Sequence, residues 1–150
     1  MSCNCEKPSE DTIRLLKECD AGCKMAIDSM EQIARYVSDD KLKSIIAKYN
    51  SDHIKLEEEI HRALNNCGRE DKEPNPLAKA SSWIQSEFKM MMKSDAHQAA
   101  SLLIDGCNMG IKSLCEYKNQ YKAADDKSVQ FCEKILAMEE KMIEELKPFL

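Results

Sequence analysis

Residues 40–67 read DKLKSIIAKYNSDHIKLEEEIHRALNNC, and this stretch decides the expected fold. Its apolar residues recur at alternating intervals of three and four, which is the pattern of an α-helix buried along one side. The same spacing suits helices that cross at roughly +20° in a left-handed bundle. The buried stripe predicted for this helix consists of Leu42, Ile46, Tyr49, His53, Leu56, Ile60, Ala63 and Cys67.

Three further long helices are predicted around this one, because good N-capping residues stand before apolar stripes of the same period. Gly68 suits the end of the helix at 40–67, since glycine tolerates the left-handed conformation common at that position. The other predicted ranges are Ser9, as N-cap, to Val37; Ser94 or Asp95 to about Ala123; and Asp125 or Asp126 to Lys147.

The connections between these helices predict how they are arranged. Short connections at 38–40 and 123–126 indicate two antiparallel hairpins, whereas the connection at 68–94 is long and carries an amphipathic segment from Leu77 to about Met92. One long crossover is typical of the ferritin-like arrangement. We therefore expect an all-α chain. Residues 9–150 should form one ferritin-like antiparallel four-helix bundle with a short extra helix in the crossover, preceded by a disordered polar tail at residues 1–8.

The composition excludes several other classes of protein. The 150 residues suffice for one domain, and only four Gly, four Pro and 5% aromatic residues argue against a β-sandwich or barrel. A net charge of −5 without a basic stripe makes nucleic acid an unexpected partner. The sequence has no run of about 20 apolar residues, so we expect no membrane span. No apolar leader follows Met1. We therefore expect a cytoplasmic protein whose cysteines are reduced.

Polar residues in the predicted stripes are the candidate ligands of a metal. Asp20, His53, Cys107 and Glu139 each lie near the middle of their helix, and a buried ionisable group must pair, stay neutral or bind metal. Together these four would suit iron or zinc. Rival apolar stripes leave Asp20 and Glu139 at the border of the core. The interpretation that competes with a metal site is a buried His53 that hydrogen-bonds a carboxylate or a backbone carbonyl inside the core.

One literal motif, Glu58-Glu59-Ile60-His61, has the Glu-x-x-His pattern of di-iron proteins. The predicted stripe of this helix puts Glu57, Glu58 and His61 off the core centre, so we interpret this stretch as a solvated face. No second Glu-x-x-His occurs, and the fourth helix has no histidine. The sequence therefore lacks a complete set of ligands for a di-iron carboxylate centre.

The eight cysteines leave two interpretations open. Cys19 and Cys23 are four residues apart on one helix face and could share a soft metal, but cysteine is more often a small core residue. Cys3-Asn4-Cys5 in the predicted tail adds a second thiol pair. A thiol redox or metal-buffering protein is therefore a further alternative.

The chain resembles bacterial ferritin-like proteins of unknown function that are distant relatives of rubrerythrin. The resemblance covers about residues 11–149 and implies a four-helix bundle with a crossover. In metal-binding relatives it also implies a carboxylate-bridged di-iron centre. The residues that carry it are the segments 20–26 (DAGCKMA), 42–46 (LKSII) and 105–110 (DGCNMG), together with Trp83.

Two departures from that pattern lead to the preferred hypothesis. Asn50 stands three residues before His53, where a Glu-x-x-His needs Glu, and Met142 stands three after Glu139, where it needs His. We therefore expect a non-catalytic binding or structural bundle with a degenerate di-iron site and no cofactor. The alternative is an iron- or zinc-binding protein or oxidoreductase with an unusual Asp/His/Cys/Glu centre. A homo-oligomer is left open, because Met and aromatic surface invites partners.

Overall fold

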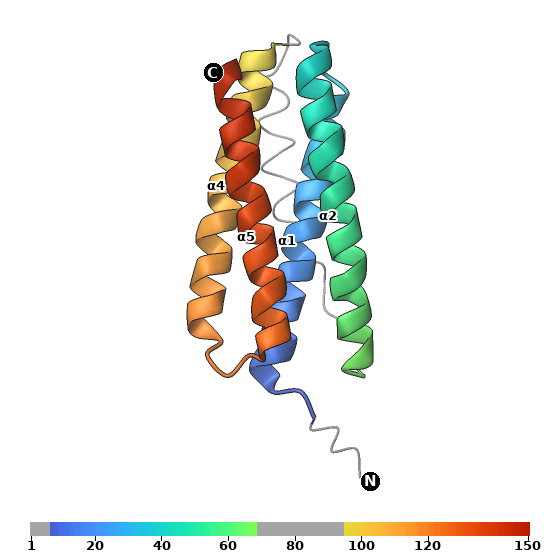
Figure 1. The fold of residues 1–150 in the computed structure, drawn as a ribbon, viewed down its shortest axis with the longest axis vertical. Helices are drawn as coiled ribbons and strands as arrows, with labels where there is room; N and C mark the ends of the chain where they lie inside the picture. The colour runs from blue at the N-terminus through green and yellow to red at the C-terminus, as the bar shows by residue number, and fades with distance from the viewer. Residues whose placement is uncertain (1–6, 69–94) are drawn as a thin grey trace.

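The computed structural model describes residues 7–68 and 95–150 (Figure 1), and within them the chain is helical with no strand. The four predicted long helices are confirmed, with ends that differ from the prediction by a few residues. The predicted crossover helix at 77–92 and most of the predicted tail lie outside the described residues. The helices are α1 (Glu10–Ala34), α2 (Asp40–Asn66), α4 (Ala96–Gln120) and α5 (Asp126–Leu146), and a 3₁₀ turn at Lys147–Phe149 follows α5.

Each long helix begins at a capping residue that the sequence predicts. The side chains of Ser9, Asp39, Asp95 and Asp125 accept hydrogen bonds from backbone N–H groups of the first turn, at 2.8–3.1 Å. These bonds satisfy donors that have no partner within the helix. After α2, Gly68 adopts a φ of 73°, which confirms its role as a left-handed terminator.

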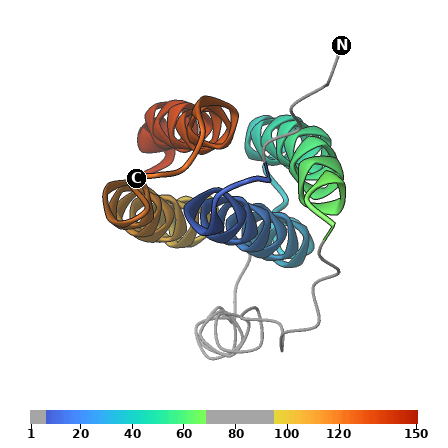
Figure 2. The same ribbon diagram turned by 90° about the horizontal axis from the view of Figure 1, so that it is seen from below.

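The four helices form a bundle of two antiparallel hairpins, α1–α2 and α4–α5. Figure 2 shows the bundle end on, with α1 beside α2 and α4, and with α5 beside α4 and α2. In Figure 1, α1 and α5 run in one direction and α2 and α4 in the other. The end of α2 and the start of α4 therefore lie at opposite ends of the bundle. No described helix is long and apolar enough to cross a membrane.

The core consists of two apolar clusters, one toward each end of the bundle. One cluster contains Leu42, Ile46, Leu103 and Leu146, and the other contains Leu15, Leu56, Ile60 and Ile135, among further residues. On α2 the buried stripe agrees with the prediction as far as Ile60, after which Leu64 rather than Ala63 is buried. The buried charged and imidazole side chains Asp20, His53 and Glu139 belong to neither cluster. A polar layer therefore interrupts the apolar core.

Candidate functional site

His53 lies in the core at the middle of α2, fully buried, as the sequence predicts. Its Nε2 lies 2.7 Å from Glu139 Oε1 on α5, and its Nδ1 lies 2.7 Å from the backbone oxygen of Tyr49, one turn earlier on α2. Glu139 is itself 6% exposed. The two predicted ligands His53 and Glu139 thus meet inside the bundle, and both ring nitrogens of His53 have partners.

The partners of His53 define where its protons are. A carbonyl oxygen only accepts hydrogen bonds, so Nδ1 carries a hydrogen that it donates to Tyr49. The contact between Nε2 and Glu139 needs one more proton, which either group can carry. Burial lowers the pKa of His53, but the hydrogen bond and negative charge of Glu139, the hydrogen bond to Tyr49 and the charge of Asp52 together outweigh it, so the pKa is raised. The pair as a whole remains close to neutral.

Cys107 on α4 extends this buried group. It is 4% exposed. Burial, together with the charge of nearby Glu139, raises the pKa of Cys107, so the thiol stays protonated at neutral pH. A buried thiol therefore lies near the His53–Glu139 pair. Among the described residues, the ligand atoms of His53, Glu139 and Cys107 do not all come within 4.8 Å of one another.

Asp20, the fourth predicted ligand, contributes to a different group. Its carboxylate lies near the carboxylate of Glu57 and the imidazole of His61, which are both on α2. One ligand atom from each of these three residues lies within 4.8 Å of the other two. Asp20 is 4% exposed, and its Oδ1 is buried without a hydrogen-bond partner. Its Oδ2 lies 2.8 Å from Lys24 Nζ. This is the arrangement in the described part of the chain that best suits a cation.

In this second group two carboxylates lie close together in a partly buried site, and each disfavours the negative charge of the other. Burial raises the pKa of Glu57, and the neighbouring carboxylate of Asp20 raises it further. Lys24 and His61 act in the opposite direction on the same carboxyl group. Carboxylate oxygens and imidazole nitrogen are the ligands that zinc takes alongside thiolate. We call Asp20, Glu57 and His61 the α1–α2 triad.

The sequence found one member of the triad and missed two. The expectation of a solvated face is right for Glu58, Glu59 and His61, which are exposed, but wrong for Glu57, whose side chain is only 17% exposed. The missed signal is the spacing of Glu57 and His61, four residues apart and so neighbours on one helix face. Their meeting with Asp20 depends on how α1 packs against α2.

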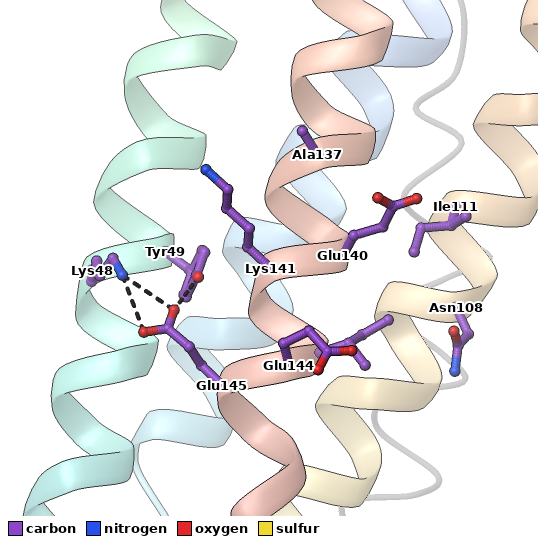
Figure 3. Close-up of a pocket in the computed structure, with 10 residues that line it drawn as sticks. Lys48, Tyr49, Asn108, Ile111, Ala137, Glu140, Lys141, Glu144 and Glu145 are labelled. Carbon is purple, nitrogen blue, oxygen red and sulfur yellow. Dashed lines mark hydrogen bonds and ion pairs between the residues drawn. The ribbon is translucent and has the colours of Figure 1, made fainter.

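A separate surface depression lies between α4 and α5, with side chains of α2 at its edge (Figure 3). Glu145 on α5 accepts hydrogen bonds there from the Tyr49 hydroxyl and from Lys48 Nζ, the latter at 3.1 Å. These bonds lower the pKa of Glu145, with that from Tyr49 contributing most. Two lysines and three glutamates line the depression, so neither sign of charge dominates it. None of the predicted ligands is among its lining residues.

Comparison with known proteins gives no match: no family model, no curated protein and no solved structure matches this chain. Two groups of polar side chains in the described part of the chain are the candidate sites: the buried pair of His53 and Glu139, with Cys107 nearby, and the α1–α2 triad.

Proposed function

We propose that this chain is a non-catalytic helical bundle that binds one divalent metal ion at Asp20, Glu57 and His61, with zinc as the preferred ion. The observation that carries the proposal is the buried Oδ1 of Asp20, which lacks a hydrogen-bond partner although it lies beside a second carboxylate and an imidazole. An unsatisfied buried carboxylate oxygen is costly, and a metal ion would remove that cost.

The donor set fits zinc better than the other candidate, iron. Zinc binds oxygen and nitrogen at about 2.0–2.2 Å, so its ligand atoms in a tetrahedral site lie about 3.4 Å apart. Triad atoms within 4.8 Å need only small side-chain rotations to reach that separation, and His61 is exposed enough to make one. Sites of this type bind zinc more tightly than ferrous iron. Three protein ligands leave the fourth position to water.

We also propose that the bundle is ferritin-like, related to rubrerythrin, with a degenerate di-iron site at its centre. The helix directions support this, because an up-down-down-up order with one crossover is the ferritin-like connectivity. At the centre, Glu139 hydrogen-bonds His53 directly, which supports a closed polar pair in place of a metal cluster. Ferrous oxidation with oxygen consumption by the full chain would contradict this part of the proposal.

A second candidate is the unusual centre of Asp20, His53, Cys107 and Glu139, holding iron or zinc. The arrangement that favours it is Nδ1 of His53 donating to a backbone carbonyl, which is how metal-ligating histidines are commonly oriented. Binding there would require the metal to replace the proton between His53 and Glu139. The two candidates therefore differ in which histidine binds the metal: His61 in the first and His53 in the second.

Titration calorimetry with zinc tests the first candidate. The full chain under reducing conditions, with Cys3→Ser and Cys5→Ser to remove the tail thiols, should bind one zinc ion. Asp20→Asn, Glu57→Gln or His61→Gln should each weaken binding at least tenfold. The matched controls are Glu59→Gln, an exposed neighbour of Glu57, and His97→Gln, an exposed histidine on α4. Unchanged affinity in the three triad variants would refute the proposal.

Histidine imidazole resonances identify the site directly, because the chain has only three histidines. Zinc should shift the ¹⁵N signals of His61 in a saturable way and leave those of His53 and His97 in place. A shift of His53 instead would favour the second candidate.

We also propose that the chain forms a homo-oligomer. Among the described residues, Tyr36, Met109 and Leu150 are large hydrophobic side chains that are 46%, 50% and 59% exposed. Contact between copies would bury these side chains. Sedimentation equilibrium of the full chain measures it, and a monomer at high protein concentration would contradict it.

A further inference from the structure

We infer that Lys24 is a built-in competitor of the metal at the α1–α2 triad: its ammonium group occupies the cation position and must leave when a divalent ion binds. This inference rests on the proposed function, since it concerns the same site. It adds a fourth residue, which is not a ligand, and a mechanism by which the chain itself sets the affinity.

The position of the ammonium group carries the inference. Lys24 Nζ lies 2.8 Å from Asp20 Oδ2 and 3.9 Å from Glu57 Oε1, so one cation contacts the carboxylates of two different helices. Asp20 and Lys24 are one turn apart on α1, with the acid on the N-terminal side, which is the favourable order for such a pair. A cation is thus already held between two of the three proposed metal ligands.

The exposure of the side chains indicates which group can move. The Lys24 side chain is 40% exposed, whereas that of Asp20 is 6% exposed and that of Glu57 is 17% exposed. Lysine has a long flexible stem and can place its ammonium group in water without disturbing the packing. The carboxylates are fixed by burial between α1 and α2. Metal binding therefore requires the lysine to swing out, together with the small rotations that bring the ligand atoms to the metal.

A tethered competitor lowers apparent affinity even when its own interaction is weak. The ammonium is covalently attached, so its effective concentration at the carboxylates is in the millimolar range or above. A divalent ion must displace it and must also approach a positive charge. The imidazole of His61 favours the metal in this competition, because zinc takes an imidazole nitrogen as a direct ligand, whereas an ammonium can only donate a hydrogen bond to it. Removing the lysine charge should raise affinity for zinc about tenfold or more.

The experiment is zinc calorimetry on the full chain, with the tail thiols again replaced by serine. Lys24→Met should bind zinc at least tenfold more tightly than the parent, and Lys24→Arg should bind with parental or lower affinity. The matched control is Lys48→Met, since Lys48 also pairs with a glutamate but on the other side of the bundle, at 3.1 Å from Glu145. Thermal unfolding of each variant without zinc verifies that it is folded.

The outcomes separate this inference from the proposed function. Tight zinc binding by Lys24→Met together with no binding by the parent supports the inference and refutes native metal binding. Zinc binding by the parent with no gain in Lys24→Met refutes the inference and leaves the proposed function standing. No binding by either protein refutes both. Where Lys24→Met is unstable, Lys24→Gln gives the same comparison with a polar side chain.

Discussion

His53 on α2 and Glu139 on α5 meet across the interior of the bundle, with Nε2 2.7 Å from Oε1, although 86 positions separate them in the chain. Both are buried, and neither belongs to the apolar clusters on either side. A buried pair of this kind favours one register of the two helices, because sliding either one would separate Nε2 of His53 from the carboxylate of Glu139.

Removing one member of the pair should destabilise the bundle strongly. Glu139→Leu leaves Nε2 of His53 buried without a partner, and such losses cost about 3–5 kcal/mol. The double variant His53→Leu with Glu139→Leu should cost clearly less than the sum of the two single changes. Urea unfolding of all three proteins measures this. The control is Glu140→Gln at the exposed neighbour, expected within about 0.5 kcal/mol of the parent. Simple additivity would contradict the structural role of the pair.

Stability should fall as the pH rises from neutral. The folded-state pKa of His53 is raised above its ordinary value of 6.5, so its stabilisation is complete below that pH. As the pH rises toward the folded pKa, the unfolded chain releases a proton that the folded chain retains, and the free energy of unfolding decreases by at most about 1.4 kcal/mol per pH unit.

Urea unfolding between pH 6.5 and 8 tests this decrease, in a range below the ordinary thiol pKa of 9.0. The double leucine variant at His53 and Glu139 should lack most of it, whereas His97→Gln should retain it. Stability that rises over this range in the parent protein would be inconsistent with the raised pKa of His53.

Metal binding should stabilise the folded chain. Zinc at about 100 times its dissociation constant adds about 2.7 kcal/mol, which corresponds to roughly 5–10 °C in Tm for a domain of this size. EDTA should reverse the shift. Differential scanning calorimetry of the parent and of Asp20→Asn measures the shift in Tm. Zinc bound by the thiols of the unfolded chain affects both proteins equally, so the difference between them reports the α1–α2 triad. Equal shifts in the two proteins would rule out the α1–α2 triad as their cause.

The buried cysteines should resist alkylation. Cys19, Cys23 and Cys132 are fully buried and Cys107 nearly so, whereas Cys67 and Cys115 are partly exposed. A hydrogen bond to Cys132 and burial raise the pKa of Cys19, and burial raises the pKa of Cys23, so neither forms the reactive thiolate at neutral pH.

Peptide mass spectrometry after brief treatment with iodoacetamide at neutral pH measures this protection. Label should appear at Cys67 and Cys115 and be absent from the buried four until urea is added. Fast labelling of Cys19 and Cys23 in the folded protein would revive the thiol-redox alternative.

Two classes of glycine should respond in opposite ways to substitution by alanine. Gly106 and Gly110 lie inside α4, and a Cβ at either would meet no described atom within 4 Å, so alanine should stabilise by about 0.5–1 kcal/mol at each. Gly68 has a φ of 73°, where alanine is strained, so the same change should destabilise by about 1 kcal/mol. Urea midpoints compare the three variants. A loss of stability at Gly106 or Gly110 would indicate close packing there.

Sequence patterns predicted the local structure of this protein well, because helix ends depend on nearby residues. The capping side chains act within a few positions, as Asp125 does on the N–H of Ser128. The apolar stripes indicate which face of each helix is buried. The rival stripe that would leave Glu139 at the border of the core is compatible with burial of Glu139, because Phe131 and Ile135 are buried together with Cys132 and Glu139. A helix in the middle of a bundle buries a wider face than one stripe.

Four helices, their caps and the burial of His53 could thus be predicted from the amino-acid sequence, since periodicity and capping are properties of a single helix. Which polar residues meet depends instead on how the helices pack. Packing of α2 on α5 brings His53 to Glu139, whereas packing of α1 on α2 brings Asp20 to Glu57 and His61. The rotation of each helix about its axis governs these contacts, and that rotation is set by the packing of all four helices together.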